Sequence, residues 1–337
     1  GHFYFSYLTS FMFWLAIAAG GLFFVAVHHA VRAGWSTVVR RLAENFMGNL
    51  PIMGLLFLPI ALGLFVPGTH GGEETWLFHW THAPDDAVVA AKSPYLNIPF
   101  FLIRALFVFG IWAFLAKFFR GRSVAQDKSG DQKLTLSMQT MAPGAAALFG
   151  LTLTVGAVDW MMSLDPHWYS TIFGVYYLAG CVICINASLA LCSMWLQRNG
   201  ILTEAITTEH YHDLGKYVWA FTIFWTYIAF SQFMLIWYSN IPEETMWYGY
   251  RTGGTWLYVT FFLCIGHFIV PFFFLMSRHV KRNRRGLAIG CVWMLLIHWV
   301  DMYWLIQPVM THHHHSPDAP FHLMDITSFI GIGAIFI

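Results

Sequence analysis

Apolar residues run in stretches of about 20 along the whole chain, long enough for a helix to cross roughly 30 Å of hydrocarbon. The pattern predicts an all-α fold, a polytopic transmembrane bundle forming one integral membrane domain over residues 1–337. The predicted segments lie near residues 5–31, 49–67, 95–119, 138–164, 169–196, 214–238, 254–276, 286–308 and from 322 onward. The ninth segment ends at Ile337 after only 16 residues, and the chain begins with Gly1 instead of an initiator Met. We therefore expect further sequence at both ends.

Composition supports a membrane protein, and the distribution of charge predicts how the chain is oriented in the membrane. The chain is 58% hydrophobic and 10% charged, against the roughly 25% charged residues of an average soluble domain. Of its 18 Lys and Arg, 15 lie around the connections near 32–48, 117–137, 197–216 and 277–286, which are therefore predicted to be cytoplasmic. Gly1 and the loops near 68–94, 165–168, 239–253 and 309–321 are then predicted to lie on the outer side. Nothing in this pattern indicates a nucleic-acid partner.

The five cysteines all lie in predicted membrane helices, so structural disulfides are not expected. Cys181 and Cys184 form a C-x-x-C pair, but it sits inside an apolar helix. Close packing of small residues between helices explains it better than redox chemistry.

Polar side chains inside the hydrocarbon are the candidates for function, because each is costly unless it finds a partner or water. At 1.5 Å per residue, Arg104 lies about 13 Å, Asp301 about 10 Å and Asp159 about 7 to 8 Å below the outer helix ends. All three therefore share the outer half. His267 and His298 lie near the middle of consecutive antiparallel helices, so their rings are expected at similar depth. His298 and Asp301, three residues apart, share a helix face.

A second polar pattern lies on the helix near 214–238. Its spacing of four, three and four residues places one stripe from mid-membrane to the outer surface: Tyr227, Ser231, Met234 and Tyr238. The inner half of the membrane offers fewer polar groups, namely His28, His29, Thr152, Thr154 and Asn186. A continuous pore is therefore not predicted.

The segment DWMMSLDPHWYSTIFGVYY at 159–177 joins two membrane helices by a turn. Asp165-Pro166 is expected to end the first of them, because proline disfavours helix before it and has no amide hydrogen. Asp159 and Ser163 share a face toward the bundle, whereas Asp165 and His167 lie at its outer mouth. Carboxylate and imidazole groups there can pass protons between a buried site and water, although Asp165 and His167 can equally be simple helix-end caps.

These residues together predict a polar cavity open to the outer side. We expect Asp159 and Asp301 to line it, with Arg104 close enough to compensate at least one of them. The candidate proton path comprises Asp159, Ser163, Asp165, His167, Tyr227, Ser231, His267, His298 and Asp301. The simpler alternative is hydrogen bonding between packed helices, which for His267 alone is as good an explanation.

The chain also resembles a known family. The matching segments are DWMMSLDPHWYSTIFGVYYLAG, YHDLGKYVWAFTIFWTYIAFSQFMLIWYSNIPEET, HFIVPFFFLMSRHVKRN and HWVDMYWLIQP. They resemble the NrfD/PsrC-like membrane subunits of alternative complex III, a bacterial quinol:cytochrome c oxidoreductase, and IWYSNIPEET is most similar to the F-type subunit. The positions that match are Asp159, Ser163, Asp165, His167, Tyr169, His267, His298, Asp301 and Tyr303.

This resemblance implies ten helices around two four-helix bundles, in the bacterial inner membrane. It implies a subunit that supplies structure and proton conduction and has no redox centre of its own, with quinol or menaquinol oxidised in the complex. The implied partners are lipids, a homologous C-type subunit with the quinone site, an iron-sulfur protein, and multihaem and monohaem cytochromes c. The resemblance also leaves room for a terminal oxidase.

Two other classes of protein stay open on the residues alone. Paired mid-membrane His267 and His298 could ligate a haem b, which would make the chain a cytochrome subunit. A secondary transporter would need inverted repeats and broken helices, and no internal sequence repeat is evident. No nucleotide-binding signature or iron-sulfur cysteine set is present. The four consecutive histidines in THHHHSPDAP could bind stray metal but fit a subunit contact or solvent better.

Overall fold

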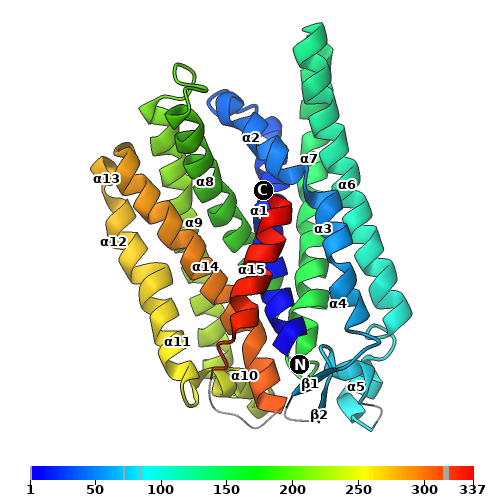
Figure 1. Ribbon diagram of the computed structural model, residues 1–337. Helices are drawn as coiled ribbons and strands as arrows, with labels where there is room; N and C mark the ends of the chain where they lie inside the picture. The colour runs from blue at the N-terminus through cyan, green and yellow to red at the C-terminus, as the bar shows by residue number, and fades with distance from the viewer. Residues whose placement is uncertain (1, 71–72, 84, 314–318) are drawn as a thin grey trace.

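The computed structural model describes residues 2–70, 73–83, 85–313 and 319–337, and most of this part of the chain is helical (Figure 1). The long helices are α1 (His2–Ala30), α6 (Ile98–Ser129), α7 (Gln132–Trp160), α8 (Phe173–Arg198), α9 (Thr208–Ser239) and α14 (Arg284–His313). The shorter α-helices are α2 (Thr37–Met47), α3 (Leu50–Leu56), α4 (Leu58–Leu62), α5 (Ala87–Lys92), α10 (Pro242–Thr252), α11 (Trp256–Leu263), α12 (Val270–Met276), α13 (Arg278–Arg282) and α15 (Leu323–Phe336). The remaining elements are the 3-10 helices η1 (His79–Thr81) and η2 (Met162–Leu164), the π-helix η3 (Cys264–Ile269), and the antiparallel strands β1 (Gly68–His70) and β2 (Glu73–Thr75).

Eight helical spans of the described chain are long and apolar enough to cross a membrane. They are His2–Ala30, Thr37–Leu62, Ile98–Ser129, Gln132–Leu164, Phe173–Arg198, Thr208–Ser239, Trp256–Met276 and Arg284–Thr311. The ninth predicted segment corresponds to the shorter apolar helix α15. The chain is therefore an all-α protein with the helices of a multi-pass membrane protein.

The second span is where the predicted boundaries were wrong. Helix was expected over 49–67, but it begins at Thr37 and ends at Leu62. Arg40, Arg41 and Glu44 lower the hydropathy of α2, which made this stretch resemble a loop, although its apolar side is buried. The span is broken into α2, α3 and α4, and prolines occupy the first turns of α3 and α4.

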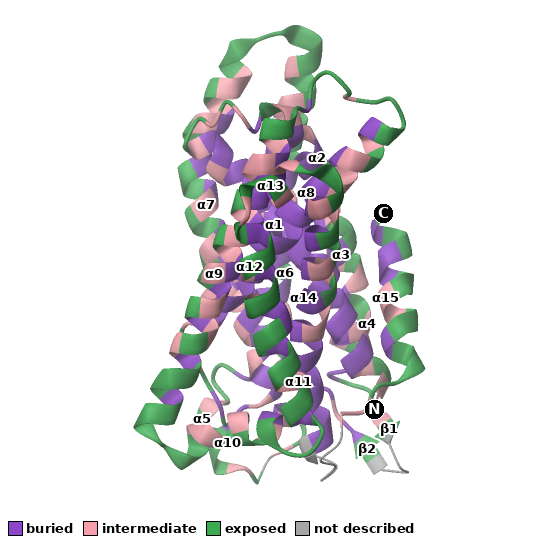
Figure 2. Cartoon of the chain, turned by 90° about the vertical axis from the view of Figure 1, so that its left-hand side faces the viewer, coloured by how far each residue is buried: buried purple, intermediate pink, exposed green. Residues whose placement is uncertain are grey.

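Helix α1 is the centre of the molecule, with 83% of its most apolar stretch buried. It contacts α2, α7, α8, α14 and α15, and Figure 2 shows the buried residues concentrated around it. A side-chain carbon on Gly20 would lie only 2.3 Å from the carbonyl oxygen of Cys181 on α8, so the two backbones approach closely. Cys181 and Cys184 are buried and free, which agrees with a packing role for this pair.

The other helices form two groups on either side of α1 (Figure 1). In one group α6 packs on α3 and α7, and in the other α8 and α12 each contact both α9 and α14. The four connections that are rich in Lys and Arg gather at one end of the molecule, near α2 and α13. The strands, α5 and α10 lie at the opposite end (Figure 1). The charge asymmetry of the sequence is therefore an asymmetry between the two ends of the fold.

Candidate functional site

Two buried aspartates, one in each helix group, are the centres of the candidate site. Asp159, near the end of α7, is 1% exposed, and Asp301 on α14 is fully buried. Their partners are separate sets of residues. The two acids are therefore best described one at a time.

Asp159 forms a buried ion pair with Arg104 of α6. The Arg104 Nε lies 2.6 Å from Asp159 Oδ2, and a second guanidinium nitrogen donates to Oδ1 at 3.1 Å. The Arg104 guanidinium also donates to the carbonyl oxygen of Tyr95 at 2.9 Å, and Tyr95 Oη donates to Asp159 Oδ1 at 2.9 Å. The contact between Arg104 and an acid that the depth argument predicted is thus confirmed, and the acid is Asp159.

The surroundings of this pair hold its members in place. The guanidinium lies 3.9 Å from the ring centre of Tyr95 and 4.3 Å from that of Phe100. Tyr95 precedes the membrane span of α6, and burial, followed by the nearby Asp159 charge, raises its pKa to about 12. Ser163 Oγ donates to the carbonyl oxygen of Asp159 at 2.5 Å. Tyr95 therefore stays protonated as a donor, and Ser163 fixes the backbone rather than the carboxylate.

Asp165 and His167 form a polar cluster with the loop before α5. His167 Nε2 lies 2.8 Å from Asp86 Oδ2, while its Nδ1 lies 3.8 Å from Asp165 Oδ1. Lys92 Nζ donates to the carbonyl oxygen of Pro166 at 2.5 Å. Partial burial would raise the pKa of Asp86, but hydrogen bonds from the amides of Val89 and Val88 and from His167 outweigh it and lower that pKa. The cluster fastens two loops at one end of the molecule.

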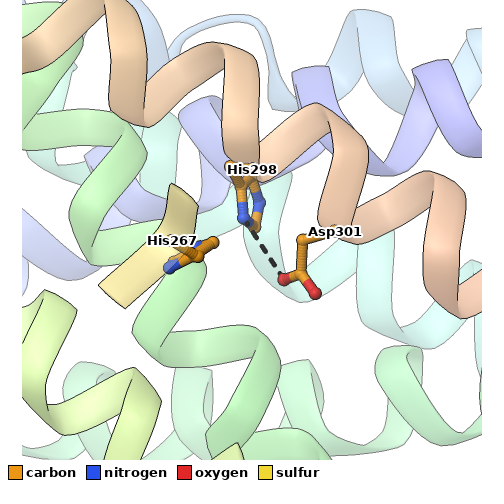
Figure 3. A group of neighbouring side chains, drawn as sticks. All are labelled: His267, His298 and Asp301. Atoms are coloured by element: carbon orange, nitrogen blue, oxygen red, sulfur yellow. Dashed lines mark ion pairs between the residues drawn. The ribbon is translucent and has the colours of Figure 1, made fainter. Parts of the chain in front are cut away.

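Asp301 belongs to a second cluster with His267 and His298, all three fully buried (Figure 3). His298 Nδ1 lies 3.7 Å from Asp301 Oδ2, and the two histidine ring centres are 6.4 Å apart. The expectation that consecutive antiparallel helices bring these rings to one depth is consistent with this contact. One ligand atom from each of the three residues lies within 4.8 Å of the others.

Local backbone features explain how the two imidazoles reach this position. His267 lies inside η3, a π-helical segment, and Pro271 cannot donate the amide hydrogen that the His267 carbonyl would otherwise accept. On the facing helix α8, a side-chain carbon at Gly180 would lie 2.3 Å from His298 Cε1. A widened helical turn thus presents His267, and a glycine makes room for His298.

Two aromatic residues complete the cluster. Tyr176 Oη of α8 donates to Asp301 Oδ1 at 2.5 Å, and Trp225 Nε1 of α9 donates to Oδ2 at 3.2 Å. The Trp225 ring also stacks on His267 with centres 3.6 Å apart. No ring nitrogen of either histidine has a hydrogen-bond partner among the described residues. Unpaired buried groups cost about 1–3 kcal/mol each, so this cluster is poised to take a proton, a water or an ion.

The two aspartates differ in their charge partners. Asp159 has Arg104, whereas no Lys or Arg in the described chain pairs with Asp301. The prediction of one shared, water-accessible cavity is corrected by this geometry: the acids have separate partners and both are buried. Depth along the membrane does not say which way a helix face is rotated, and here the acids point into different helix groups.

The predicted stripe on α9 faces outward, which is a second correction. Tyr227 is 64%, Met234 48% and Tyr238 82% exposed, and Ser231 is only partly buried. The buried face of α9 instead carries Thr222, Trp225, Ile228 and Gln232, among others. Tyr227 and Ser231 therefore do not lie in a buried path within this chain. A face toward lipid can be as apolar and aromatic as one toward protein, so spacing alone could not separate them.

Tyr95, Tyr176, Trp225 and Gly180 contribute to the sites but were not singled out from the sequence. Tyr and Trp were treated as residues of the membrane interface. For Trp225 a signal was present, because it lies near the middle of α9 rather than at its end. Of the THHHHSPDAP run, residues 314–318 and the side chains of the preceding two histidines lie outside the part that is described.

A large apolar cleft of about 1020 Å³ lies beside this cluster rather than around it. Residues of α1, α2, α8, α14 and α15 line it, and they include Phe13, Trp299 and Phe329. None of His267, His298 and Asp301 is among its lining residues, although the Phe13 ring centre lies 6.1 Å from that of His298. Size alone does not make this cleft the functional site, since lipid chains fill such grooves.

Comparison with known protein families finds no family that matches the chain, and no curated protein is significantly similar to it. The functional interpretation therefore rests on the residues themselves and on the sequence resemblance described above.

Proposed function

We propose that this chain is an integral membrane subunit of a quinol:acceptor oxidoreductase of the alternative complex III type, with an NrfD/PsrC-like fold of the F type. In this proposal it lies in the bacterial inner membrane, with its basic end in the cytoplasm. It contributes structure and a proton-transferring site, and the redox centres belong to its partners. The motif resemblance and the grouping of helices on either side of α1 support the family assignment.

The observation that carries the proton-transfer role is the Asp301 cluster. A buried carboxylate without a cation is costly, and a fold that needed only packing would avoid it. Asp301 nevertheless accepts a hydrogen bond from Tyr176, and His298 Nδ1 lies 3.7 Å from its Oδ2, so that a small side-chain shift would bring this pair to hydrogen-bond distance. Buried ionisable residues of this kind mark proton relays in membrane proteins. Asp159, in contrast, is held by its ion pair with Arg104 and fits a structural role.

The chemistry of the cluster is that of a short relay. A proton taken up by Asp301 leaves a neutral carboxyl group that still accepts from Trp225. Handing that proton to a free ring nitrogen of His298 restores the carboxylate, and His267 offers the next acceptor 6.4 Å away, ring centre to ring centre. Asn in place of Asp301 keeps the shape and removes this step.

In this proposal the chain takes its redox centres from other subunits. Its five cysteines are unpaired, and they do not cluster with histidine or carboxylate ligands in the described part of the chain. We therefore expect it to purify with an iron-sulfur protein, c-type cytochromes and a homologous C-type membrane subunit. Recovery of a stable, active monomer without haem or iron would contradict this assignment.

The direct test compares Asp301→Asn with a matched variant in the same purified complex. Quinol-dependent reduction of the acceptor should fall at least about tenfold in Asp301→Asn, while subunit composition stays the same. Asp325→Asn is the control, because Asp325 is also fully buried but caps α15 and bonds Gln307. Equal turnover in the two variants would remove Asp301 from the mechanism.

A second function is favoured by one observation, the convergence of His267, His298 and Asp301 ligand atoms within 4.8 Å. Two imidazoles and a carboxylate suit a divalent transition metal, and paired histidines suit a haem b. Metal analysis and a haemochrome spectrum of the purified chain separate these cases from the relay. Stoichiometric metal or haem that is lost in His298→Gln would replace the proposed proton role.

A further inference from the structure

A second polar site lies at the basic end of the molecule, far along α1 from its N-terminus. A cavity of about 640 Å³ is enclosed by the end of α1, the start of α2, and the facing ends of α6 and α7. Its polar lining consists of His28, His29, Arg32, Thr37, Arg40, Arg41, Glu44, Ser123, Gln126, Asp127, Thr135 and Gln139. Residues 32–48 and 117–137 were predicted to be connections between helices, so the cavity was not predicted.

The charges around this cavity do not balance. Three arginines line it against two carboxylates, Glu44 and Asp127. Arg41 serves both acids, at 2.5 Å from Asp127 and 3.4 Å from Glu44. The three arginines therefore exceed the two carboxylates by one positive charge, and neither Arg32 nor Arg40 forms an ion pair among the described residues.

Several donors that face the cavity lack an acceptor. Arg40 uses one terminal nitrogen on the Ala33 carbonyl oxygen at 2.8 Å and on Ser36 Oγ at 3.2 Å, while its buried Nε has no partner. His29 is 2% exposed, and neither of its ring nitrogens has a hydrogen-bond partner among the described residues. A neutral imidazole always carries one N–H, so His29 presents at least one unsatisfied donor. His28 donates from Nδ1 to the Phe24 carbonyl oxygen at 2.7 Å, so in the neutral ring its unpaired Nε2 is an acceptor and adds no donor to the cavity.

Unsatisfied donors beside surplus arginine charge are the features of an anion site. Guanidinium groups match phosphate oxygens in geometry as well as charge. Gly34 and Thr37, at the start of α2, lie in the cavity wall, where the positive end of the helix dipole favours an anion. A simple phosphate ion fills only part of about 640 Å³, whereas a glycerophosphate headgroup fits the space better.

We propose that this cavity binds a phosphate ester, and that the phosphate comes from the headgroup of an anionic membrane lipid. The cavity lies among the basic connections, at the end where cytoplasmic-leaflet headgroups are expected, and basic pockets between transmembrane helices bind such headgroups. Arg40 and His29 contact the phosphate, and Arg41 keeps the two carboxylates compensated. The site is independent of the Asp301 cluster and holds whether or not that cluster moves protons.

The test measures lipid binding by the full chain, within its complex, in nanodiscs. Phosphatidylglycerol discs should raise the melting temperature relative to phosphatidylcholine discs. Native mass spectrometry should find retained phosphatidylglycerol, reduced at least about tenfold in Arg40→Gln. Arg285→Gln is the matched control, because Arg285 is exposed at the same basic end and does not line the cavity.

A second variant keeps the proposal testable if Arg40→Gln does not fold. Gln139→Glu adds a negative charge to the cavity wall at a partly exposed position and should reduce retention similarly. Stabilisation by inorganic phosphate in phosphatidylcholine discs, lost in Gln139→Glu, would assign the site to a soluble phosphate instead of a lipid. Equal lipid retention in wild type, Gln139→Glu and Arg285→Gln, with no response to phosphate, would overturn the site.

Discussion

Replacing Arg104 by methionine tests the most specific contact in the fold. Methionine keeps much of the length of the side chain and removes its charge. Asp159 would then be left buried without its cation, since it is 1% exposed and its remaining side-chain donor is Tyr95 Oη. The Tyr95 carbonyl oxygen would lose its Arg104 donor as well.

The expected loss can be worked from these contacts. Breaking a buried ion pair by removing one partner costs about 3–5 kcal/mol. Loss of the guanidinium contacts with the Tyr95 and Phe100 rings adds about 0.5–1 kcal/mol each. We therefore expect Arg104→Met to reduce the free energy of unfolding by about 4–7 kcal/mol. Because most of this is the cost of an unpaired charge, Arg104→Met combined with Asp159→Asn should recover about half.

The assay is equilibrium unfolding by SDS titration in bicelles, followed by tryptophan fluorescence. Arg198→Met is the control, since Arg198 is exposed at the end of α8 and its replacement should stay within about 0.5 kcal/mol of wild type. A loss below about 1 kcal/mol for Arg104→Met would refute the reasoning. So would a double variant as unstable as the sum of the two single variants, because the partners would then be energetically independent.

Further predictions concern the packing of His298 against Gly180 and the ion pair between Asp86 and His167. Gly180→Ala should cost about 1–3 kcal/mol and lower turnover, because its new carbon would lie 2.3 Å from His298 Cε1, whereas Gly144→Ala, in open space, should not destabilise. Comparing their melting temperatures checks this, and equal values would contradict it. Asp86→Asn should cost at most about 1 kcal/mol at pH 7, since its partner His167 is half exposed. As the folded pKa of Asp86 is depressed, this contribution exists above its ordinary value of 3.8 and is lost as the pH falls through the folded pKa. The difference in unfolding between wild type and Asp86→Asn should therefore narrow as the pH is lowered from 7 to below the folded pKa of Asp86, and a constant difference would contradict the charge argument.

Residue depth was the part of the site that the sequence predicted well. Hydropathy and the rise per residue placed Arg104 near an acid and His267 near His298, because both depend only on position along a helix. Helix rotation was not predictable in the same way. The outward stripe containing Tyr227 and the buried face containing Trp225 are similarly apolar. The sequence of α9 therefore does not show which face is buried.

Features that depend on contacts between distant helices of the bundle were also not predictable from the sequence. Tyr176 reaches Asp301 from a helix 125 residues away, and Gly180 matters only because His298 packs against it. The π-helical turn at His267 is suggested by Pro271 only after the helix is known to continue through it. The basic cavity near Arg40 was missed because α2 is amphipathic and its charged residues resemble a loop.

The most direct test of the central claim is proton release per quinol oxidised, measured with a pH indicator in proteoliposomes containing the intact complex. The claim is that Asp301 passes protons between His298 and Tyr176 while partner subunits carry the electrons. It predicts that Asp301→Asn releases fewer protons per electron than wild type at matched, low turnover, and that Asp325→Asn keeps the wild-type ratio. An Asp301→Asn complex with the wild-type ratio and rate would contradict it.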